Sequence, residues 1–182
     1  MFDQDRVYEA PVPIKRATAH PQSFLITTPN AVELTTHWFG TSLVCSGKDC
    51  PACNEAWQWR TVFYVGAIAA GGNRVILELP HHLSGQIDRA KVDFKMVGHA
   101  WKVQTIGKSG NKVQLEIAEE AYDGVVHPVE RNALLDQIAR IYHLPRRRDF
   151  DNDQEWGKAM KEKAAQKLTM GLSSSAAQES NL

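Results

Sequence analysis

Three cysteines and one histidine form the residue group with the clearest chemistry in this sequence. Cys45, Cys50 and Cys53 lie close together, the chain contains no other cysteine, and His37 precedes them. Zn²⁺ takes four nitrogen or sulfur ligands in a tetrahedron, and a Cys-x-x-Cys pair brings two thiolates to one point from a tight turn. The spacing therefore predicts one bound zinc ion, with His37 as the fourth ligand. Because four protein ligands close the shell, the ion is expected to stabilise the fold rather than to carry out catalysis.

Three residues compete with His37 for the fourth position, namely Asp49, His81 and His82. The cysteines also permit other interpretations. Small buried hydrophobic residues, or a disulfide with one spare thiol, are less favoured because three clustered cysteines do not make a closed disulfide framework. A thioredoxin-like redox site at Cys50 and Cys53 is less favoured still. Such motifs open a helix in an α/β pattern, whereas this region is rich in predicted strands and turns.

The composition suits one compact domain with appended segments. The chain has 182 residues, of which 43% are hydrophobic, and 21 basic residues balance 21 acidic ones. This balance excludes a uniformly basic protein, so an anionic partner is expected to contact a local patch. The acidic start, residues 1–5, is unlike a secretory signal, and the longest apolar run, residues 62–70, is too short to span a bilayer. With reduced cysteines, these features predict a soluble cytoplasmic protein without a membrane partner.

Short strands joined by turns dominate the first two thirds of the chain. Apolar and β-branched residues predict strands over residues 24–28, 32–39, 57–68, 74–79, 92–106 and 112–117. The glycine-containing segments 71–73 and 107–111 predict hairpin turns, and Gly98 predicts a bend or bulge. A short helix is expected over residues 80–90, between the two hairpins.

Two helices are predicted in the last third of the chain. Apolar residues recur at helical spacing from Leu134 to Tyr142, behind Pro128 and before Pro145. This pattern predicts a helix that packs on the sheet. A more polar helix is expected over residues 154–168.

Together these elements predict a mainly β fold with C-terminal helices, of the α+β class. Bent strands in two hairpins favour an OB-like small β-barrel with an inserted zinc-binding loop. The predicted organisation comprises an extended N-terminal arm (1–21), an OB-like core (22–126) with a zinc subdomain (37–56), a packing helix (127–145), a charged segment and polar helix (146–170) and a flexible tail (171–182).

The predicted strand over residues 57–68 has two different faces. Alternation places Phe63 and Val65 on a face typical of a core, and Arg60 and Tyr64 on the opposite face. A guanidinium and an exposed aromatic ring are suited to hold phosphates and to stack on unpaired bases. Basic residues also outnumber acidic ones between residues 85 and 115. The candidate nucleic-acid contacts are Trp59, Arg60, Tyr64, Arg74, Lys95, His99, Trp101 and Lys102.

A purely structural interpretation of these residues stays open. Strand aromatics more often pack inside a protein than lie exposed, and strand lysines often only solvate an edge. Trp38 is ambiguous, because it adjoins a predicted ligand and can simply cover the metal. The segment 146–148 contains three arginines, but Asp149, Asp151 and Asp153 follow it and are expected to neutralise much of its charge. It is therefore predicted to be only a secondary patch.

The motifs come in a recognisable order: His37-Trp38, Cys45, Cys50-Pro51-Ala52-Cys53, an aromatic strand, the segment 74–79 and a short polar segment ending in Ile87. This order resembles the zinc-containing single-stranded DNA-binding proteins of tailed phages, over about residues 30–90. Those proteins have an OB fold with an inserted zinc subdomain. The resemblance implies that His37 and the three cysteines bind zinc. It also implies that aromatic and basic strand residues line a DNA cleft.

The expected function is sequence-tolerant binding of single-stranded nucleic acid, with DNA as the favoured ligand. The protein would protect or present single strands in phage or mobile-element replication or recombination, and its C-terminal helices would contact proteins of those processes. RNA stays open, since no linear signature reports a contact to the 2′-hydroxyl.

Two alternatives to this function remain. One is a zinc-stabilised adaptor subunit of a nucleoprotein complex. The other is a zinc-dependent enzyme that modifies nucleic acids. A zinc deaminase needs His-x-Glu and Pro-Cys-x-x-Cys, but no glutamate follows His37 at that spacing, and Pro51 lies inside the cysteine pair. The chain is therefore not expected to be an enzyme.

Overall fold

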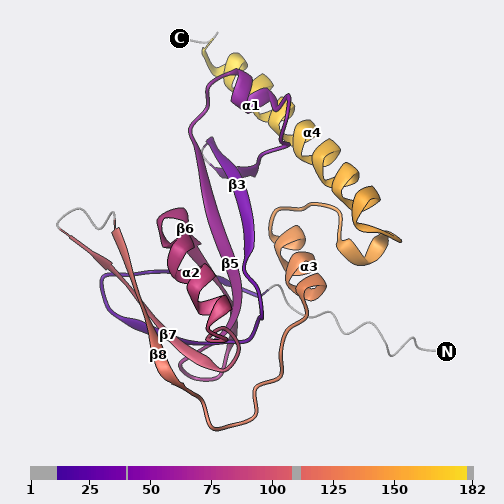
Figure 1. Ribbon diagram of the computed structural model, residues 1–182. Coiled ribbons are helices and arrows are strands. Elements are labelled where there is room, and N and C mark those ends of the chain that lie inside the picture. The colour runs from indigo at the N-terminus through magenta and orange to yellow at the C-terminus, as the bar shows by residue number, and fades with distance from the viewer. Residues whose placement is uncertain (1–11, 40, 108–111, 180–182) are drawn as a thin grey trace.

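The computed structural model describes residues 12–39, 41–107 and 112–179 and shows a mainly β protein with C-terminal helices (Figure 1). The predicted fold class is therefore confirmed. The strands are β1 (Ile14–Arg16), β2 (Gln22–Ile26), β3 (Val32–Phe39), β4 (Thr41–Val44), β5 (Trp59–Ala69), β6 (Arg74–Pro80), β7 (His99–Ile106) and β8 (Lys112–Ala121). The helices are α1 (Pro51–Asn54), η1 (His81–Leu83), α2 (Ser84–Val92), α3 (Arg131–Ile141), η2 (Arg147–Asp149) and α4 (Asp153–Glu179).

The long strand β5 organises the sheet, whose strand order is β1-β6-β5-β2-β7-β8. β2 pairs with the end of β5, where Phe24 lies opposite Ala69, whereas β3 pairs with its beginning, where His37 lies opposite Trp59. β4 then pairs with β3. We call β3, β4, α1 and the first half of β5 the metal arm. The arm extends beyond the rest of the sheet and carries α1 at its end (Figure 1).

The strands do not close into a barrel. Within the described residues, no ladder joins β8 to β6, and β1 instead pairs with β6 in parallel. The backbone N–H of Thr105 in β7 donates to the carbonyl of Thr18, just after β1. The segment predicted only as an extended arm thus contributes an edge strand at the opening. The open eight-stranded sheet fits the predicted mainly β class, but the predicted small barrel is not closed.

Both faces of the central part of β5, from Val62 to Ala67, are buried. Phe63 and Val65 belong to one hydrophobic core, which α2 covers through Ile87. Tyr64 and its neighbours on the opposite face belong to a second core, formed with Leu135 and other residues of α3. Figure 1 shows α2 and α3 beside β5. The alternation was predicted in the correct register, but the sequence did not reveal that α3 covers the second face.

The C-terminal helices differ from the prediction at their ends. α3 starts after Glu130 rather than at Pro128, and α4 continues to Glu179, past the predicted end at residue 168. The segment 171–179, predicted as part of a flexible tail, is therefore helical, while residues 180–182 lie outside the described residues. Among the described helices, none combines the length and the apolar character needed to cross a membrane.

Phe94, two residues after the end of α2, has a backbone conformation that is unfavourable for most residues other than glycine, and it provides a first testable prediction. The N–H of Lys95 donates to the carbonyl of Ala90 and that of Phe94 to the carbonyl of Lys91, a pattern that places Phe94 at a left-handed position with φ 58°. Glycine is preferred there. Because the Phe94 side chain is 87% exposed, its removal loses little burial. We expect Phe94→Gly to raise the free energy of unfolding by about 1 kcal/mol in urea denaturation. Gly replacement of the neighbouring Asp93, which has a negative φ, is the control and should destabilise the protein.

Candidate metal centre and the surface beside it

Four side chains from the metal arm converge at its end. His37 lies on β3, Cys45 directly follows β4, and Cys50 and Cys53 lie at the start and within the single turn of α1. Pro51 suits the first position of α1 because its ring fixes a helical φ and that position needs no N–H donor. The turn brings Cys50 and Cys53 together, and the hydrogen bond from the Cys45 N–H to the Thr35 carbonyl holds the third cysteine beside β3.

The ligand atoms of these four residues all lie within 4.8 Å of one another. His37 Nε2 is 3.4 Å from Cys50 Sγ and 3.5 Å from Cys53 Sγ, and the sulfurs of Cys45 and Cys53 are 3.8 Å apart. A tetrahedral ion with bonds of about 2.3 Å to sulfur and about 2.1 Å to nitrogen separates two sulfurs by about 3.8 Å and a sulfur from a nitrogen by about 3.6 Å. The four residues therefore fit a single tetrahedral metal ion, and all three cysteines are free thiols.

The competing ligands lie elsewhere. Within the described residues, the converging group contains neither Asp49 nor the two histidines after β6. His81 instead stacks on Phe63, and His82 makes its contact with the carbonyl of Val113. His37 is thus the histidine that completes the group, as predicted.

The three crowded thiols have pKa values that are shifted in different directions. Burial opposes ionisation of Cys50, but hydrogen bonds from the Cys53 backbone and from Ser46 outweigh it and lower the pKa of Cys50 to about 6. Burial, followed by the neighbouring thiols, raises the pKa of Cys53 to about 12, and burial also raises the pKa of Cys45. One thiolate therefore forms readily, and further ionisation needs a compensating cation such as a metal ion.

Residues 45–57, which carry the three cysteines and which we call the metal loop, are also the surface on which α4 packs. Leu168 of α4 is fully buried and forms a small hydrophobic cluster with Cys50 and Ala52, against which Leu43 and Trp57 also pack. Figure 1 shows α4 lying along α1 at the end of the metal arm. The order of this loop therefore supports the position of the C-terminal helix as well as that of the arm.

An exposed tryptophan lies directly opposite the metal-ligand histidine. In the ladder between β3 and β5, His37 pairs with Trp59, and opposed residues project from the same face of a sheet. Trp59 is 67% exposed, and Trp38, which projects from the other face, is 56% exposed. The predicted contact Trp59 is thus accessible, and a metal ion bound to His37 would fix the strand beside it.

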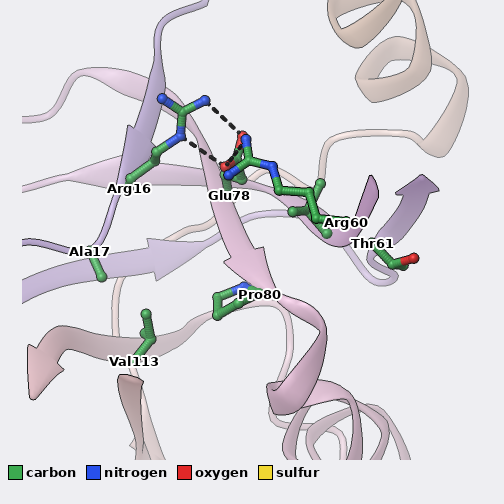
Figure 2. Close-up of a pocket in the computed structure, with 8 residues that line it drawn as sticks. Arg16, Ala17, Arg60, Thr61, Glu78, Pro80 and Val113 are labelled. Atoms are coloured by element: carbon green, nitrogen blue, oxygen red, sulfur yellow. Dashed lines mark hydrogen bonds and ion pairs between the residues drawn. The ribbon is translucent and has the colours of Figure 1, made fainter. Parts of the chain in front are cut away.

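An open pocket of about 240 Å³ lies between β1, β5, β6 and β8 and includes Arg60, the neighbour of Trp59 in the chain (Figure 2). Glu78 lies in it with a side chain that is only 4% exposed. Arg16 donates to both carboxylate oxygens of Glu78, at 2.8 and 3.1 Å, and Arg60 contacts one of them at 3.2 Å. The hydrogen bond to Glu78 raises the pKa of Arg16. Both guanidinium groups remain about half exposed, so the pocket presents positive charge to solvent.

Three of the predicted nucleic-acid contacts are buried, and these predictions are corrected. Tyr64 is fully buried under α3, where its hydroxyl donates to Glu78 and lies 2.6 Å from the hydroxyl of Tyr142. Trp101 is fully buried in the core under α2, and its indole N–H donates to the carbonyl of Lys95. His99 is buried beside the Ala118 carbonyl. None of the three offers a ring face to a base in this structure.

The remaining predicted contacts are exposed to different degrees. Lys95 and Lys102 form ion pairs with Glu119 and Glu116 of β8, so the charge of each of these two lysines is paired within the protein. The prediction missed these carboxylates because they come just after the basic stretch in sequence. Arg74 is exposed at the start of β6, at the far end of the hairpin from Arg60.

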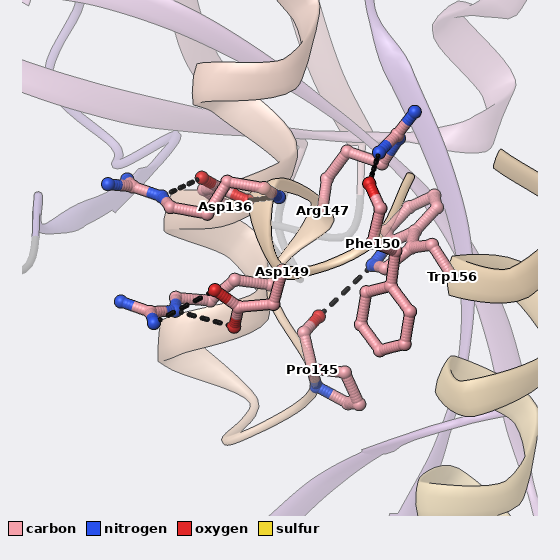
Figure 3. A network of polar contacts seen from close by, with 8 residues as sticks. Asp136, Pro145, Arg147, Asp149, Phe150 and Trp156 are labelled. Carbon is pink, nitrogen blue, oxygen red and sulfur yellow. Dashed lines mark hydrogen bonds and ion pairs between the residues drawn. The ribbon is translucent and has the colours of Figure 1, made fainter. Parts of the chain in front are cut away.

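The three arginines of residues 146–148 form intramolecular ion pairs, and Figure 3 shows part of this network around Asp136 and Asp149. Arg146 pairs with Asp149 and Arg147 with Asp153, as the nearby acidic residues suggested. Arg148 contacts the buried carboxylate of Asp136 in α3, and this contact was not predicted. The cluster therefore joins η2 to the helices on either side of it, and its charge is largely neutralised.

Sequence reasoning missed Arg16 and Glu78 as members of the accessible pocket. Arg16 reaches the pocket only because β1 pairs with β6, which places it directly opposite Glu78. The sequence did mark Glu78 as unusual, since it is the single charged residue within the apolar run 75–79. A carboxylate in such a run usually needs a cationic partner.

Comparison of this chain with protein-family models, with curated proteins and with solved structures finds no match. The assignment of the site therefore depends on the geometry and chemistry of the residues described above.

Proposed function

We propose that this protein binds single-stranded DNA in a sequence-tolerant manner and that a structural zinc ion holds the binding surface in place. The observation that carries the proposal is the pairing of His37 with the exposed Trp59. The metal ligand and the candidate stacking residue are cross-strand neighbours. Ordering of the metal loop is therefore expected to order the surface that meets the strand.

Zinc is the metal that suits the ligand set best. One imidazole and three thiolates form a common structural zinc site, and the spacing of the ligand atoms fits tetrahedral coordination. Soft thiolates disfavour Mg²⁺ and Ca²⁺, which prefer oxygen ligands. Four protein ligands leave no open position for a substrate, so we assign the ion a role in stability.

The surface next to the metal arm has the two features that single-strand binders combine. Trp59 offers an exposed aromatic ring, and Arg60 and Arg16 offer guanidinium groups. Trp59 and Arg60 project from opposite faces of β5, but β6 ends at Pro80, opposite Val62. Between Trp59 and Thr61, the edge of β5 that faces away from β3 is therefore not paired with any described β-strand. A DNA strand can approach this edge and reach the side chains on both faces. Stacking on an aromatic ring tolerates any base, and guanidinium groups bind the backbone.

Trp59 provides the direct test of the proposal. We expect labelled oligo-dT to bind more tightly than a duplex in fluorescence anisotropy, with affinity that falls as salt increases. Replacing Trp59 by alanine should weaken binding about 5- to 150-fold, because stacking on one base contributes about 1–3 kcal/mol. Trp38→Ala is the matched control, since this ring is similarly exposed but lies on the other face. Failure of the wild-type protein to bind oligo-dT at low salt, or equal losses in both variants, would contradict the proposal.

A further inference from the structure

The pocket that contains Arg16, Arg60 and Glu78 has the properties of an oxyanion site (Figure 2). We propose that it binds a single phosphate group, held by the two guanidinium groups. Its assignment to a backbone phosphate of a DNA strand rests on the proposed function, whereas the binding of an oxyanion as such does not.

The charge of the pocket matches one phosphodiester. Two guanidinium groups share the single carboxylate of Glu78, so these three side chains carry a net charge of plus one. A backbone phosphate carries one negative charge. A basic groove of this kind is what single-strand binders use to follow the backbone.

The two arginines retain unused hydrogen-bond donors. Among the described contacts with Glu78, Arg16 uses Nε and Nη2, and Arg60 uses Nη2. Each guanidinium has five N–H groups in a planar fork, which suits the paired oxygens of a phosphate. Arg60 is held by a single contact at 3.2 Å, whereas Arg16 is held by two shorter ones, so Arg60 is freer to turn towards a ligand.

Glu78 arranges the donors before a ligand arrives. Its carboxylate is buried and accepts a hydrogen bond from the hydroxyl of Tyr64, which itself contacts Tyr142, the residue directly after α3. The carboxylate thus holds both guanidinium groups at the mouth of the pocket. Such preorganisation lowers the entropy that ligand binding would otherwise cost.

The size and the walls of the pocket suit a small anion. Its volume of about 240 Å³ lies below the range typical of sites for drug-sized ligands, which begins at about 300 Å³. The apolar side chains of Ala17, Val62, Pro80 and Val113 form much of the remaining wall. Arg16, Arg60 and Glu78 are therefore the charged groups among the residues that line it.

Titration with inorganic phosphate tests the site without DNA. We expect saturable binding in isothermal calorimetry and in NMR titrations, with shifts confined to residues around the pocket. Arg60→Ala should weaken phosphate binding about tenfold or more, because a charge-assisted hydrogen bond is lost. This variant should fold, since Glu78 keeps both contacts with Arg16. Arg74→Ala removes an exposed arginine of the same sheet and should leave binding unchanged.

The outcomes separate this inference from the proposed function. Phosphate binding that is lost in Arg60→Ala and kept in Arg74→Ala supports the oxyanion site, even if oligo-dT does not bind. If the wild-type protein binds no phosphate, or if both variants lose it equally, the inference is overturned. Binding of oligo-dT that Arg60→Ala and Arg16→Ala both leave unchanged overturns the assignment of the site to a backbone phosphate, while the proposed function would stand.

Discussion

Replacing Cys50 by serine is expected to remove the metal ion and to destabilise the C-terminal part of the fold. A serine hydroxyl is a poor substitute for a thiolate ligand, and Cys50 is fully buried between α1 and Leu168 of α4. Zinc binding contributes about 10–16 kcal/mol to folding in zinc-finger peptides. Because only part of this chain depends on the site, we expect a smaller loss, of at least about 3 kcal/mol. That loss corresponds to a melting temperature lower by about 6–12 °C.

Elemental analysis and thermal unfolding measure the two effects. The wild-type protein should contain one zinc ion per chain, and a strong chelator should lower its melting temperature as the Cys50 variant does. Asp49→Asn is the control, because Asp49 lies in the same loop but outside the ligand group, and asparagine tolerates its left-handed φ of 63°. A Cys50→Ser protein that kept its metal and its melting temperature would falsify the metal assignment.

The metal ligands could be predicted from the sequence because their arrangement is largely local. A turn of α1 brings Cys50 and Cys53 together, and the short β3–β4 hairpin brings His37 and Cys45 to the same end of the arm. These contacts need no knowledge of the rest of the fold. The sequence favoured His37 over the two later histidines, and the structure agrees, since His81 has its own stacking partner in Phe63.

The proposed binding surface was harder to predict because it depends on contacts between distant segments. Strand alternation grouped Tyr64 with Arg60 correctly, but α3, more than sixty residues later, covers Tyr64 and leaves Arg60 at the edge. Lys95, which precedes β7, and Lys102, which lies in β7, looked free because their partners Glu119 and Glu116 lie on the next strand. Periodicity reports the two faces of a strand, but it does not report what packs on each face.

Arg16 is a pocket residue that local sequence patterns could not identify. It lies in a proline-containing segment without periodicity, so nothing local marks it as part of a site. Its contact with Glu78 exists because a strand of three residues pairs in parallel with β6. Parallel pairing between segments far apart in the chain has no local sequence signature.

Replacing Tyr64 by alanine is expected to lower the free energy of unfolding by about 3–5 kcal/mol, the usual range for removal of a large buried aromatic side chain. The ring is fully buried between β5 and α3, and its hydroxyl contacts both Glu78 and Tyr142. This result would differ from the effect of Trp59→Ala, which should change affinity with little change in stability. Urea denaturation of the two variants, together with oligo-dT binding by Trp59→Ala, separates a structural aromatic residue from an exposed one. Equal stabilities of the Tyr64→Ala and wild-type proteins would show that α3 does not cover this face.

Tyr64→Phe removes only the hydroxyl group, so it measures the contribution of that group to stability and how this contribution changes with pH. Losing the hydroxyl should cost about 1–2 kcal/mol at pH 7, because the buried hydroxyl of Tyr142 loses its partner. Burial raises the pKa of Tyr64 above its ordinary value of 10.0, so the folded state favours the neutral phenol. The stability from this group is then present below pH 10 and decreases as the pH rises above it, because only the unfolded chain ionises. Tyr64→Phe should therefore lose less stability between pH 9 and pH 11 than the wild-type protein does, and a steeper loss would contradict the buried position of the hydroxyl.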